Sequence, residues 1–365
     1  MDPSVLNLAE LEVHELEAAL VALGVPPFHG RQIFSWIHGR GVTRFEEMTD
    51  LAAALRTRLA ERFIVDTPAL DDVQTSEDGT TKFLLRLADG RRIESVYIPD
   101  TPAQTFCIST QVGCAMACAF CLTGKMGLIR HLTAGEIAGQ VRVLAHHTGL
   151  AQSTFNIVLM GMGEPLHNYD ATMKALRILA DERGMALHPK RVTLSTVGLL
   201  PALERLATEP LMPNLAISLH ATTDESRSAL VPLNKRYDLK ALLDVCRRFP
   251  VNRRARITFE YVMLDGVNDT PEDAHRLVRL LSGIRGKVNL LPLNEAPGIP
   301  FRRPDDARVN AFARILADRD VRVSVRKSRG RDIRAACGQL LVEGSAPSPA
   351  QDLAARMSTP SSPRH

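Results

Sequence analysis

Three cysteines lie within eight residues of one another, at Cys114, Cys118 and Cys121, with the spacing Cys-x3-Cys-x2-Cys. An iron–sulfur cubane normally takes four thiolates, and a structural zinc ion takes four Cys or His ligands. Because no fourth cysteine lies close by, the spacing predicts a cluster with one open iron that can bind a substrate. The alternative is a zinc site completed by a more distant side chain, such as His131 or Cys107.

The spacing, with the aromatic Phe120 directly before the last cysteine, resembles the signature of the radical S-adenosylmethionine (SAM) enzymes. In that superfamily the open iron chelates the amino and carboxylate groups of SAM. An electron from the cluster then splits the sulfonium and yields a 5′-deoxyadenosyl radical. The resemblance therefore implies a 4Fe–4S cluster and SAM as cofactors.

Polar groups that could bind such a ligand follow several predicted strands. The run Gly161-Met-Gly163-Glu164-Pro165 offers a carboxylate and two glycines, which let the backbone approach a ligand closely. Two further strands end at Ser195 and at Ser218-Leu219-His220, and a third leads into Asn294. Each signal is weak alone, because such residues are usually structural. Together, after one cysteine triad, they predict a SAM pocket.

Three cysteines lie outside the triad. Cys246 occupies an apolar helix position and is expected to be a buried structural thiol. Cys107 lies on the first predicted strand of the large domain, and Cys337 follows the last one. Closing the sheet would bring these two thiols over the same pocket. Since a thiolate is a good nucleophile toward an activated methyl group, the pair suggests alkyl transfer.

Alternating strands and amphipathic helices must position these groups between residues 104 and about 338. Strands are expected at 105–109, 155–160, 191–196, 214–218, 256–262, 287–291 and 321–325, and helices at 135–147, 169–183, 239–249, 271–284 and 305–318. Repeated βα units predict a parallel sheet, either open or closed into a full or partial barrel. In such folds the chemistry gathers at the carboxyl ends of the strands, where the triad follows the first strand.

Two smaller units are expected before this core domain, which we place at 101–340. Residues 1–70 form a helical domain, with helices near 11–23, 30–38 and 51–63. Residues 71–100 form a β-hairpin linker, because the apolar period switches to two and Asp89-Gly90 separates the runs. Glu94 lies in its second strand, where a carboxylate most often faces solvent. The Ser/Pro/Ala-rich residues 341–365 are expected to be a disordered tail.

Composition points to a soluble globular chain, with 45% hydrophobic and 24% charged residues among 365. No apolar run approaches the ~20 residues of a membrane span, and the first residues lack the layout of a signal peptide. Six cysteines, three of them bunched as ligands, indicate a reducing compartment, and we expect the cytoplasm.

The net charge of +4 is modest, but basic residues cluster. The first cluster is Arg322, Arg326, Lys327, Arg329, Arg331 and Arg334; the second is Arg247, Arg248, Arg253, Arg254 and Arg256; the third is Arg302 and Arg303. Such clusters attract polyphosphate backbones, although a solvated basic face would look the same.

Longer motifs resemble one family, the RlmN adenine C2-methyltransferases of bacterial ribosomal and transfer RNA. They are Gln111–Cys121, Gly161–Pro165, Ser218–His220 and Arg334–Leu340, extended upstream by Cys107 and by Glu94 in Ile-Glu-Ser-Val-Tyr-Ile-Pro. Gly30–His38 resembles the helical accessory domain of that family, and the likeness spans residues 5 to 340. It implies an α/β fold, a partial (β/α)6 barrel of the TIM type.

The resemblance also implies a role for each site residue. Cys114, Cys118 and Cys121 hold the cluster, and the SAM site is lined by Gly163, Glu164, Ser195, Ser218, Leu219, His220 and Asn294. One SAM methylates Cys337, and a second SAM supplies the radical that takes hydrogen from this S-methyl group. The methylene radical adds to adenine C2, and loss of an electron and of the C2 proton, followed by a Cys107–Cys337 disulfide, releases the product. Glu94 is the family's proton acceptor, and Cys107 is a physically plausible competitor.

The implied partners are 23S rRNA in its peptidyl-transferase region, the anticodon loop of tRNA, and reduced flavodoxin or ferredoxin as electron donor. A monomer that contacts no membrane is the default. The related alternative is the Cfr-type enzyme, which methylates adenine C8, confers antibiotic resistance and shares the same cysteines. The alternative of another class is a non-catalytic RNA-binding protein with a structural zinc site.

Overall fold

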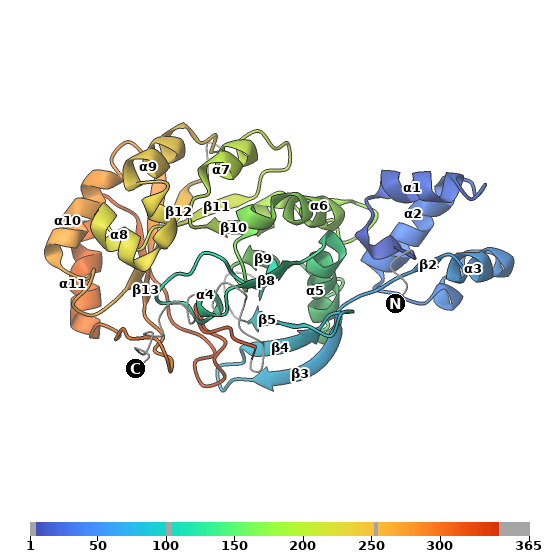
Figure 1. Ribbon diagram of the computed structural model, residues 1–365, viewed down its shortest axis with the longest axis horizontal. Coiled ribbons are helices and arrows are strands. Elements are labelled where there is room, and N and C mark those ends of the chain that lie inside the picture. Colours follow the sequence, from blue (N-terminus) through green and yellow to red (C-terminus); the bar gives the residue numbers. More distant parts are fainter. Residues whose placement is uncertain (1–4, 100–103, 252–254, 343–365) are drawn as a thin grey trace, which may run out of the picture.

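The fold is built around one ten-stranded sheet with the order β14-β13-β12-β11-β10-β9-β6-β5-β4-β3 (Figure 1). The computed structural model describes residues 5–99, 104–251 and 255–342. Seven neighbouring strands run parallel, namely β6 (Thr105–Cys107), β9 (Asn156–Leu159), β10 (Val192–Thr196), β11 (Asn214–Ser218), β12 (Ile257–Met263), β13 (Gly286–Pro292) and β14 (Val323–Val325). All seven strands predicted for the core are confirmed, as is an α/β fold with a mostly parallel sheet.

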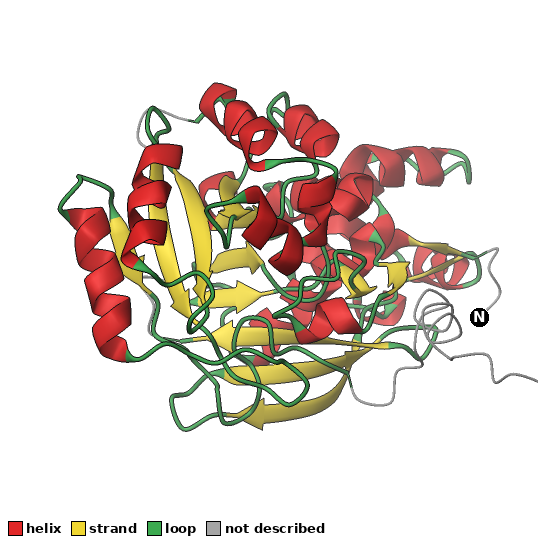
Figure 2. Ribbon diagram, turned by 60° about the vertical axis from the view of Figure 1, so that its left-hand side comes forward, coloured by secondary structure: helices red, strands yellow, loops and turns green. Residues whose placement is uncertain are grey.

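Helices cover the outer face of this sheet (Figure 2). They are α5 (Ala134–His147), α6 (Tyr169–Ala180), α7 (Leu200–Leu206), α8 (Asp224–Leu230), α9 (Leu239–Arg248), α10 (Pro271–Leu280) and α11 (Asp306–Ala317). The five predicted core helices are confirmed, while α7 and α8 were missed because each spans only seven residues. The capping box that starts α5 is present, with the Thr133 hydroxyl accepting from the Glu136 amide and the Glu136 carboxylate accepting from the Thr133 amide.

Three antiparallel strands extend the sheet beyond β6: β3 (Ala69–Thr75), β4 (Thr81–Arg86) and β5 (Arg92–Ile98). We call these three strands and their turns the antiparallel extension. The predicted hairpin is present, and Gly90 takes the positive φ of 80° that its turn requires. The third strand, β3, was not predicted, because it is an exposed edge strand whose Asp71 and Asp72 interrupt the apolar pattern.

The N-terminal helices form a separate small cluster at one end of the molecule, to the right in Figure 1. They are α1 (Val13–Val21), α2 (Phe28–Phe34), which continues as a π-helical turn (Ser35–Gly39), and α3 (Ala53–Ala60). The strands β1 (Leu6–Asn7) and β2 (Phe63–Ile64) pair in parallel and bring the two ends of this unit together. Its three predicted helices are confirmed, each with somewhat different ends.

Two ion pairs join the N-terminal helices to α6. Lys174 lies 2.7 Å from Glu15, and Arg177 lies 2.8 Å from Glu12. Within the described residues, no helix is long and apolar enough to cross a membrane. The tail expected at 341–365 lies outside the described residues from 343 onward, as do Arg253 and Arg254 of the second basic cluster.

Candidate active site

The cysteine triad lies on a loop between the short strand β7 (Gln111–Gly113) and the helical turn α4 (Leu122–Lys125). β7 pairs with β8 (Leu128–His131), which closes the loop, and the Cys114 amide donates to the Gly127 carbonyl at 2.8 Å. These strands were not predicted, because three or four residues carry too little periodicity. Their pairing holds all three thiols against one cavity at the carboxyl ends of the parallel strands.

Burial makes the three thiols poor acids. It raises the pKa of Cys114 to about 12, and burial, helped by the neighbouring Cys121 thiol, also holds the pKa of Cys118 well above its ordinary value. Bringing such groups into one place as thiolates is costly unless a cationic centre binds them, and metal binding releases their protons. Unpaired thiols gathered at one cavity therefore fit a bound metal cluster better than a purely structural core.

The donor set fits a cubane with an open iron. Among the described residues, no three His, Cys, Asp or Glu side chains are arranged so that they could hold a single metal ion. The three thiolates of a cubane bind three different irons and need not converge on one point. The side of the triad that faces the cavity is lined by the strand ends, where a ligand of the open iron would lie.

Six of the seven predicted SAM-site residues line this cavity. They are Gly163 and Glu164 after β9, Ser195 on β10, Ser218 at the end of β11, His220, and Asn294 after β13. The hydroxyl oxygens of Ser195 and Ser218 lie 3.3 Å apart, and Asn294 Oδ1 is a buried acceptor without a hydrogen-bond partner among the described residues. Leu219 differs: its side chain is fully buried in the core and lines no part of the cavity.

Glu164 joins the ends of two strands. Its carboxylate accepts the Leu166 amide at 3.0 Å and the Val197 amide at 2.9 Å, and its own amide donates to Gln111 Oε1. Burial raises the pKa of Glu164 to about 7, although these hydrogen bonds favour the charged form. Gly163 has to be glycine, because a Cβ at its φ of 106° would lie 2.6 Å from Gln111 Cβ.

His220 is a neutral imidazole in the wall of the cavity. Its Nδ1 accepts the Val262 amide at 3.0 Å, which places the ring proton on Nε2. Burial, and then the positive charge of Arg227, lowers the pKa of His220 to about 3. The ring packs edge-on against Phe120, with centroids 4.7 Å apart, so the triad loop contacts the turn that follows β11.

Arg227, which was not among the predicted site residues, is buried behind this wall. Its guanidinium donates to the carbonyls of Val197 at 2.7 Å, Ser218 at 3.2 Å and Leu219 at 3.1 Å, and to Asn234 Oδ1 at 2.9 Å. It thereby ties the ends of β10 and β11 together beneath the ligand cavity. No sequence signal marked it, because one arginine on a short helix is ordinarily a surface residue.

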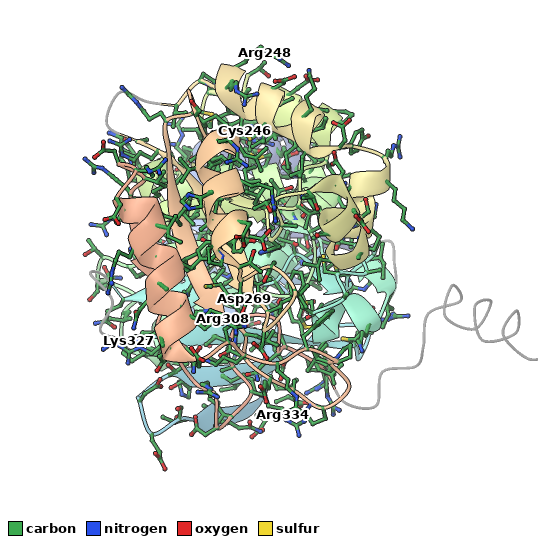
Figure 3. All side chains as sticks on the ribbon, turned by 90° about the vertical axis from the view of Figure 1, so that its left-hand side faces the viewer. Cys246, Arg248, Asp269, Arg308, Lys327 and Arg334 are labelled. Carbon is green, nitrogen blue, oxygen red and sulfur yellow. The ribbon has the colours of Figure 1, made fainter. Side chains whose placement is uncertain are left out.

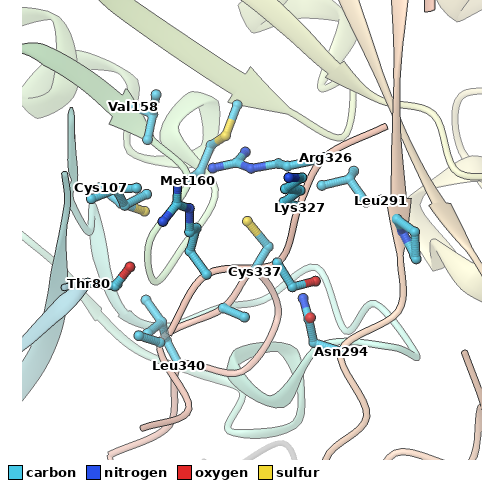
Figure 4. A pocket seen from close by; sticks show the side chains of 16 residues that line it. Thr80, Cys107, Val158, Met160, Leu291, Asn294, Arg326, Lys327, Cys337 and Leu340 are labelled. Carbon is cyan, nitrogen blue, oxygen red and sulfur yellow. The ribbon is translucent and has the colours of Figure 1, made fainter. Parts of the chain in front are cut away.

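Cys337 lies where the first cavity meets a second one, and Figure 4 shows its thiol directed into that space. Cys107 lines the second cavity from the opposite side, and both cysteines are free thiols. Burial, and then the neighbouring Cys337 thiol, raises the pKa of Cys107 to about 12. The structure thus brings these two cysteines to one cavity, as predicted from their places at the two ends of the domain.

Arg326 lines both cavities beside these thiols. Its pKa is raised by the charge that Cys337 carries when ionised, against the opposing effect of burial. In the sequence this residue belongs to the first basic cluster. Arg326 is not an ordinary surface cation, because it lies beside the Cys107 and Cys337 thiols and the buried Glu260 carboxylate.

Glu94 is buried, with 4% of its surface exposed, so the expectation that it faces solvent is wrong. It does not line either cavity; instead its Oε1 lies 3.0 Å from Lys82 Nζ, and its Oε2 accepts the Leu341 amide at 2.8 Å. The lysine on the neighbouring strand compensates the charge, which is why a carboxylate is tolerated there.

A mostly parallel sheet, a cysteine triad after its first parallel strand and a cavity that several polar strand ends line are the features of a radical SAM enzyme. The sequence model of the Radical SAM superfamily matches residues 108–281, and that of the Ribosomal RNA large subunit methyltransferase N-terminal domain matches residues 6–65. A dual-specificity RNA methyltransferase RlmN from Anaeromyxobacter dehalogenans is 48% identical over 96% of both chains.

Two further comparisons agree. The RlmN of Geobacter sulfurreducens is 49% identical over 92% of both chains. The crystal structure of a radical SAM methyltransferase from Sphaerobacter thermophilus superposes with a TM-score of 0.88 at 47% identity, over 92% of this chain and 99% of the other. The chain therefore belongs to the RlmN family of radical SAM methyltransferases.

Proposed function

We propose that this chain methylates C2 of adenine in RNA, at adenine 2503 of 23S rRNA and adenine 37 of tRNA, with Cys337 as the methyl carrier. The relatives named dual-specificity RNA methyltransferase support RNA as the substrate class. The observation that carries the proposal is the position of Cys337, which lines both the cavity of the cysteine triad and the cavity of Cys107.

The cofactor residues are those at the first cavity. A 4Fe–4S cluster on Cys114, Cys118 and Cys121, when bound, supplies the electron that cleaves SAM reductively. The hydroxyls of Ser195 and Ser218 lie where they can donate to a ribose or a carboxylate, and the unpartnered Asn294 Oδ1 can accept from an amino group. His220 presents a neutral ring, so it adds no charge that would repel a sulfonium.

Cys337 takes the methyl group first. Its thiolate attacks the methyl carbon of SAM, a C–S bond forms as the sulfonium C–S bond breaks, and S-adenosylhomocysteine leaves. Arg326, which lines both cavities, places a positive charge beside this sulfur.

A carrier is needed because adenine C2 is an electron-poor carbon that cannot attack a sulfonium. The methyl group on Cys337 loses a hydrogen atom to the 5′-deoxyadenosyl radical from a second SAM, which becomes 5′-deoxyadenosine, and the methylene carbon adds to C2. The adduct then loses the C2 proton to a base and one electron, which the oxidised cluster would accept. When the Cys107 sulfur bonds to the Cys337 sulfur, the Cys337 S–C bond breaks, and its electron pair with one proton completes the new methyl group. External thiols then reduce the disulfide.

Two groups compete for the C2 proton. Cys107 lines the same cavity as Cys337, whereas the oxygens of Glu94 are engaged by Lys82 and by the Leu341 amide. A base has to reach the proton that it removes. We therefore favour Cys107, whose raised pKa makes its thiolate a strong base once it has formed.

The remaining partners are part of the proposal. Reduced flavodoxin or ferredoxin is the electron donor, and the chain acts as a monomer. A reducing cytoplasm suits a site that needs five free thiols, those of Cys107, Cys114, Cys118, Cys121 and Cys337.

The decisive experiment is anaerobic turnover of the reconstituted enzyme with SAM that carries a trideuterated methyl group, on ribosomal RNA and on tRNA. Mass spectrometry of the nucleosides should give 2-methyladenosine that lacks one methyl deuterium, because a hydrogen atom is removed from the carrier. Retention of all three deuterons would sink the carrier mechanism, and 8-methyladenosine would indicate the Cfr-type activity.

Two variants provide the controls. Cys337→Ala should abolish product, whereas Cys246→Ala should retain it, because Cys246 is buried in α9 outside both cavities. If anaerobic reconstitution yields no iron–sulfur absorbance near 400 nm and Cys337→Ala leaves function intact, the chain is a zinc-containing RNA-binding protein instead.

A further inference from the structure

Cys337 lies on a segment that has no helix or strand of its own. We call residues 328–342 the carrier segment; the structure assigns them only turns, bends and irregular backbone. Such a segment cannot fix a side chain through its own hydrogen-bond ladder. The position of Cys337 therefore depends on the groups that hold the segment from other parts of the chain.

One set of contacts comes from the triad loop. The Leu122 amide, next to Cys121, donates to the Gly338 carbonyl at 2.8 Å, and the Thr123 hydroxyl donates to the Leu340 carbonyl at 2.7 Å. These bonds fix the carrier segment directly on the helical turn that follows the last cysteine of the triad.

A second set comes from the antiparallel extension. The Asp332 carboxylate accepts the Ser76 hydroxyl at 2.5 Å and the Glu77 amide at 3.3 Å, and the Gly330 amide donates to Asp78 Oδ2 at 3.1 Å. The turn between β3 and β4 thereby holds the part of the segment that precedes Cys337.

The part that follows Cys337 is held by Lys82 and Glu94. Leu84 is the direct partner of Glu94 across β4 and β5, so Lys82 lies two residues along on the same face of the sheet. Lys82 Nζ binds one carboxylate oxygen of Glu94, and the other oxygen accepts the Leu341 amide at 2.8 Å. The side chains are only 12% and 5% exposed, so water screens this pair weakly.

We propose that Lys82 and Glu94 form a positioning pair that holds Cys337 at the junction of the two cavities. Lys82 fixes the orientation of the carboxylate, and the carboxylate fixes the Leu341 amide four residues after the carrier. A charge-assisted hydrogen bond of this kind is stronger than a neutral one. The pair acts through the carrier segment and touches no reacting atom; its catalytic consequence rests on the proposed function of Cys337.

The test compares Glu94→Ala, Glu94→Gln and Lys82→Met in the reconstituted holoenzyme. The first readout is hydrogen exchange at the Leu341 amide. The second is methylation of Cys337 by SAM without RNA, followed by mass spectrometry of the intact protein. This methylation involves no adenine proton, so the loss of a general base would leave it unchanged.

We expect Glu94→Ala to accelerate exchange at Leu341 about tenfold or more and to slow methylation of Cys337 by a similar factor, as the loss of a hydrogen bond to a charged group implies. Lys82→Met should change both readouts in the same direction. Glu94→Gln keeps an oxygen that can accept the Leu341 amide and should recover part of both. The matched control is Arg92→Gln on β5, because Arg92 pairs with Asp71 on the exposed side of the extension and should change neither.

The inference is overturned if Glu94→Ala leaves exchange at Leu341 and methylation of Cys337 at wild-type rates and blocks only the release of methylated RNA. Glu94 would then be the proton acceptor. Exchange at Leu341 could accelerate in Glu94→Ala as expected while Cys337 of the wild-type enzyme takes no methyl group from SAM. In that case the positioning role stands and the proposed function fails. Glu94→Gln and Lys82→Met keep the test decisive if Glu94→Ala does not fold.

Discussion

At the scale of the residue, burial makes ordinary side chains unusual. It raises the pKa of Cys107 to about 12 and of Glu164 to about 7, and it lowers the pKa of His220 to about 3. All three shifts favour the uncharged form. These three groups therefore add little charge to the site, and the cation Arg326 lies beside both Cys107 and Cys337.

The pKa of Cys107 predicts how product release depends on pH. With a pKa of about 12, the thiolate fraction rises with pH, about tenfold per unit, throughout the range in which RNA survives. Release of methyladenosine in a single turnover of enzyme premethylated on Cys337 should therefore accelerate about tenfold per unit between about pH 7 and pH 9. Rates are measured by quenching and nucleoside mass spectrometry.

Two variants frame this measurement. Cys107→Ser should trap the RNA adduct at every pH in that range, because a serine hydroxyl ionises only at far higher pH and forms no disulfide. Cys246→Ala should keep the wild-type slope. A release rate that does not change with pH would show that deprotonation of Cys107 does not limit this step.

At the scale of the element, the sequence predicted what periodicity encodes. Apolar runs such as that of β12 (Ile257–Met263) predicted the seven parallel strands, and an amphipathic pattern predicted α5. The strands β7 and β8 carry no such pattern. They exist because they pair with each other across the triad loop, and that pairing is a tertiary contact.

The site residues were likewise predictable only where a local pattern or motif marks them. Groups at strand ends were found because the carboxyl ends of parallel strands share one edge, and motifs supplied Cys107 and Cys337. Arg227, Lys82 and the distinct position of Arg326 were missed. Their importance comes from burial against partners that lie far away in the sequence. Lys82, for example, pairs with Glu94, and Glu94 in turn accepts the Leu341 amide. No local pattern contains that information.

The buried hydrogen bonds of Arg227 predict that its removal destabilises the fold at the ends of two strands. Arg227→Met would leave the carbonyls of Val197, Ser218 and Leu219 without their donor at the ends of β10 and β11. Breaking a buried charged network of this kind lowers the free energy of unfolding by roughly 3–5 kcal/mol. Urea denaturation measures this loss, and SAM binding should weaken with it because Ser218 lines the ligand cavity.

The matched control is Arg236→Met. Arg236 is exposed and stacks on Tyr237, so its loss should change stability by no more than about 0.5 kcal/mol. Equal effects of the two substitutions would mean that the buried hydrogen bonds of Arg227 contribute nothing beyond those of a surface arginine.

At the scale of the whole molecule, the N-terminal helices dock on the core through a buried histidine. His38 is 1% exposed, and its Nδ1 accepts Arg142 Nη1 at 3.0 Å from α5. Burial, and then the charge of Arg142, holds the pKa of His38 well below its usual 6.5. The docked unit therefore needs His38 to be neutral.

This contact predicts a pH-dependent stability. Below pH 6.5 the unfolded chain protonates His38 and the folded chain does not, so its contribution is present above pH 6.5 and is lost as the pH falls, by about 1.4 kcal/mol per unit. His38→Gln retains an acceptor for Arg142 but does not titrate. Urea denaturation at about pH 6.5, 5.5 and 4.5 should show a flatter dependence for this variant. His14→Gln, at an exposed position, is the control, and equal slopes for His38→Gln and wild type would refute the prediction.

The first and second basic clusters lie at opposite ends of the molecule (Figure 3), and the sequence alone did not indicate which of them binds RNA. Lys327 and Arg334 of the first basic cluster lie at the end that carries the antiparallel extension, and Arg248 of the second cluster lies at the opposite end (Figure 3). Lys327 and Arg329 also line the cavity that holds Cys337. Arg247 and Arg248 face acidic neighbours instead, at 2.7 Å from Asp244 and 3.6 Å from Glu204. We therefore expect RNA phosphates at the first cluster.

The salt dependence of RNA binding distinguishes the first basic cluster from the second. Each phosphate contact contributes about 0.7 to 0.9 to the slope of log K against log salt. Lys327→Gln with Arg331→Gln should therefore weaken binding of an rRNA fragment and flatten that slope by about 1.4 to 1.8, measured between about 50 and 200 mM salt. Arg247→Gln with Arg248→Gln removes the same charge from the other end and should leave the slope unchanged. If the second pair flattens the slope and the first does not, RNA lies across α9, and the adenine would have to reach Cys337 from the far side of the molecule.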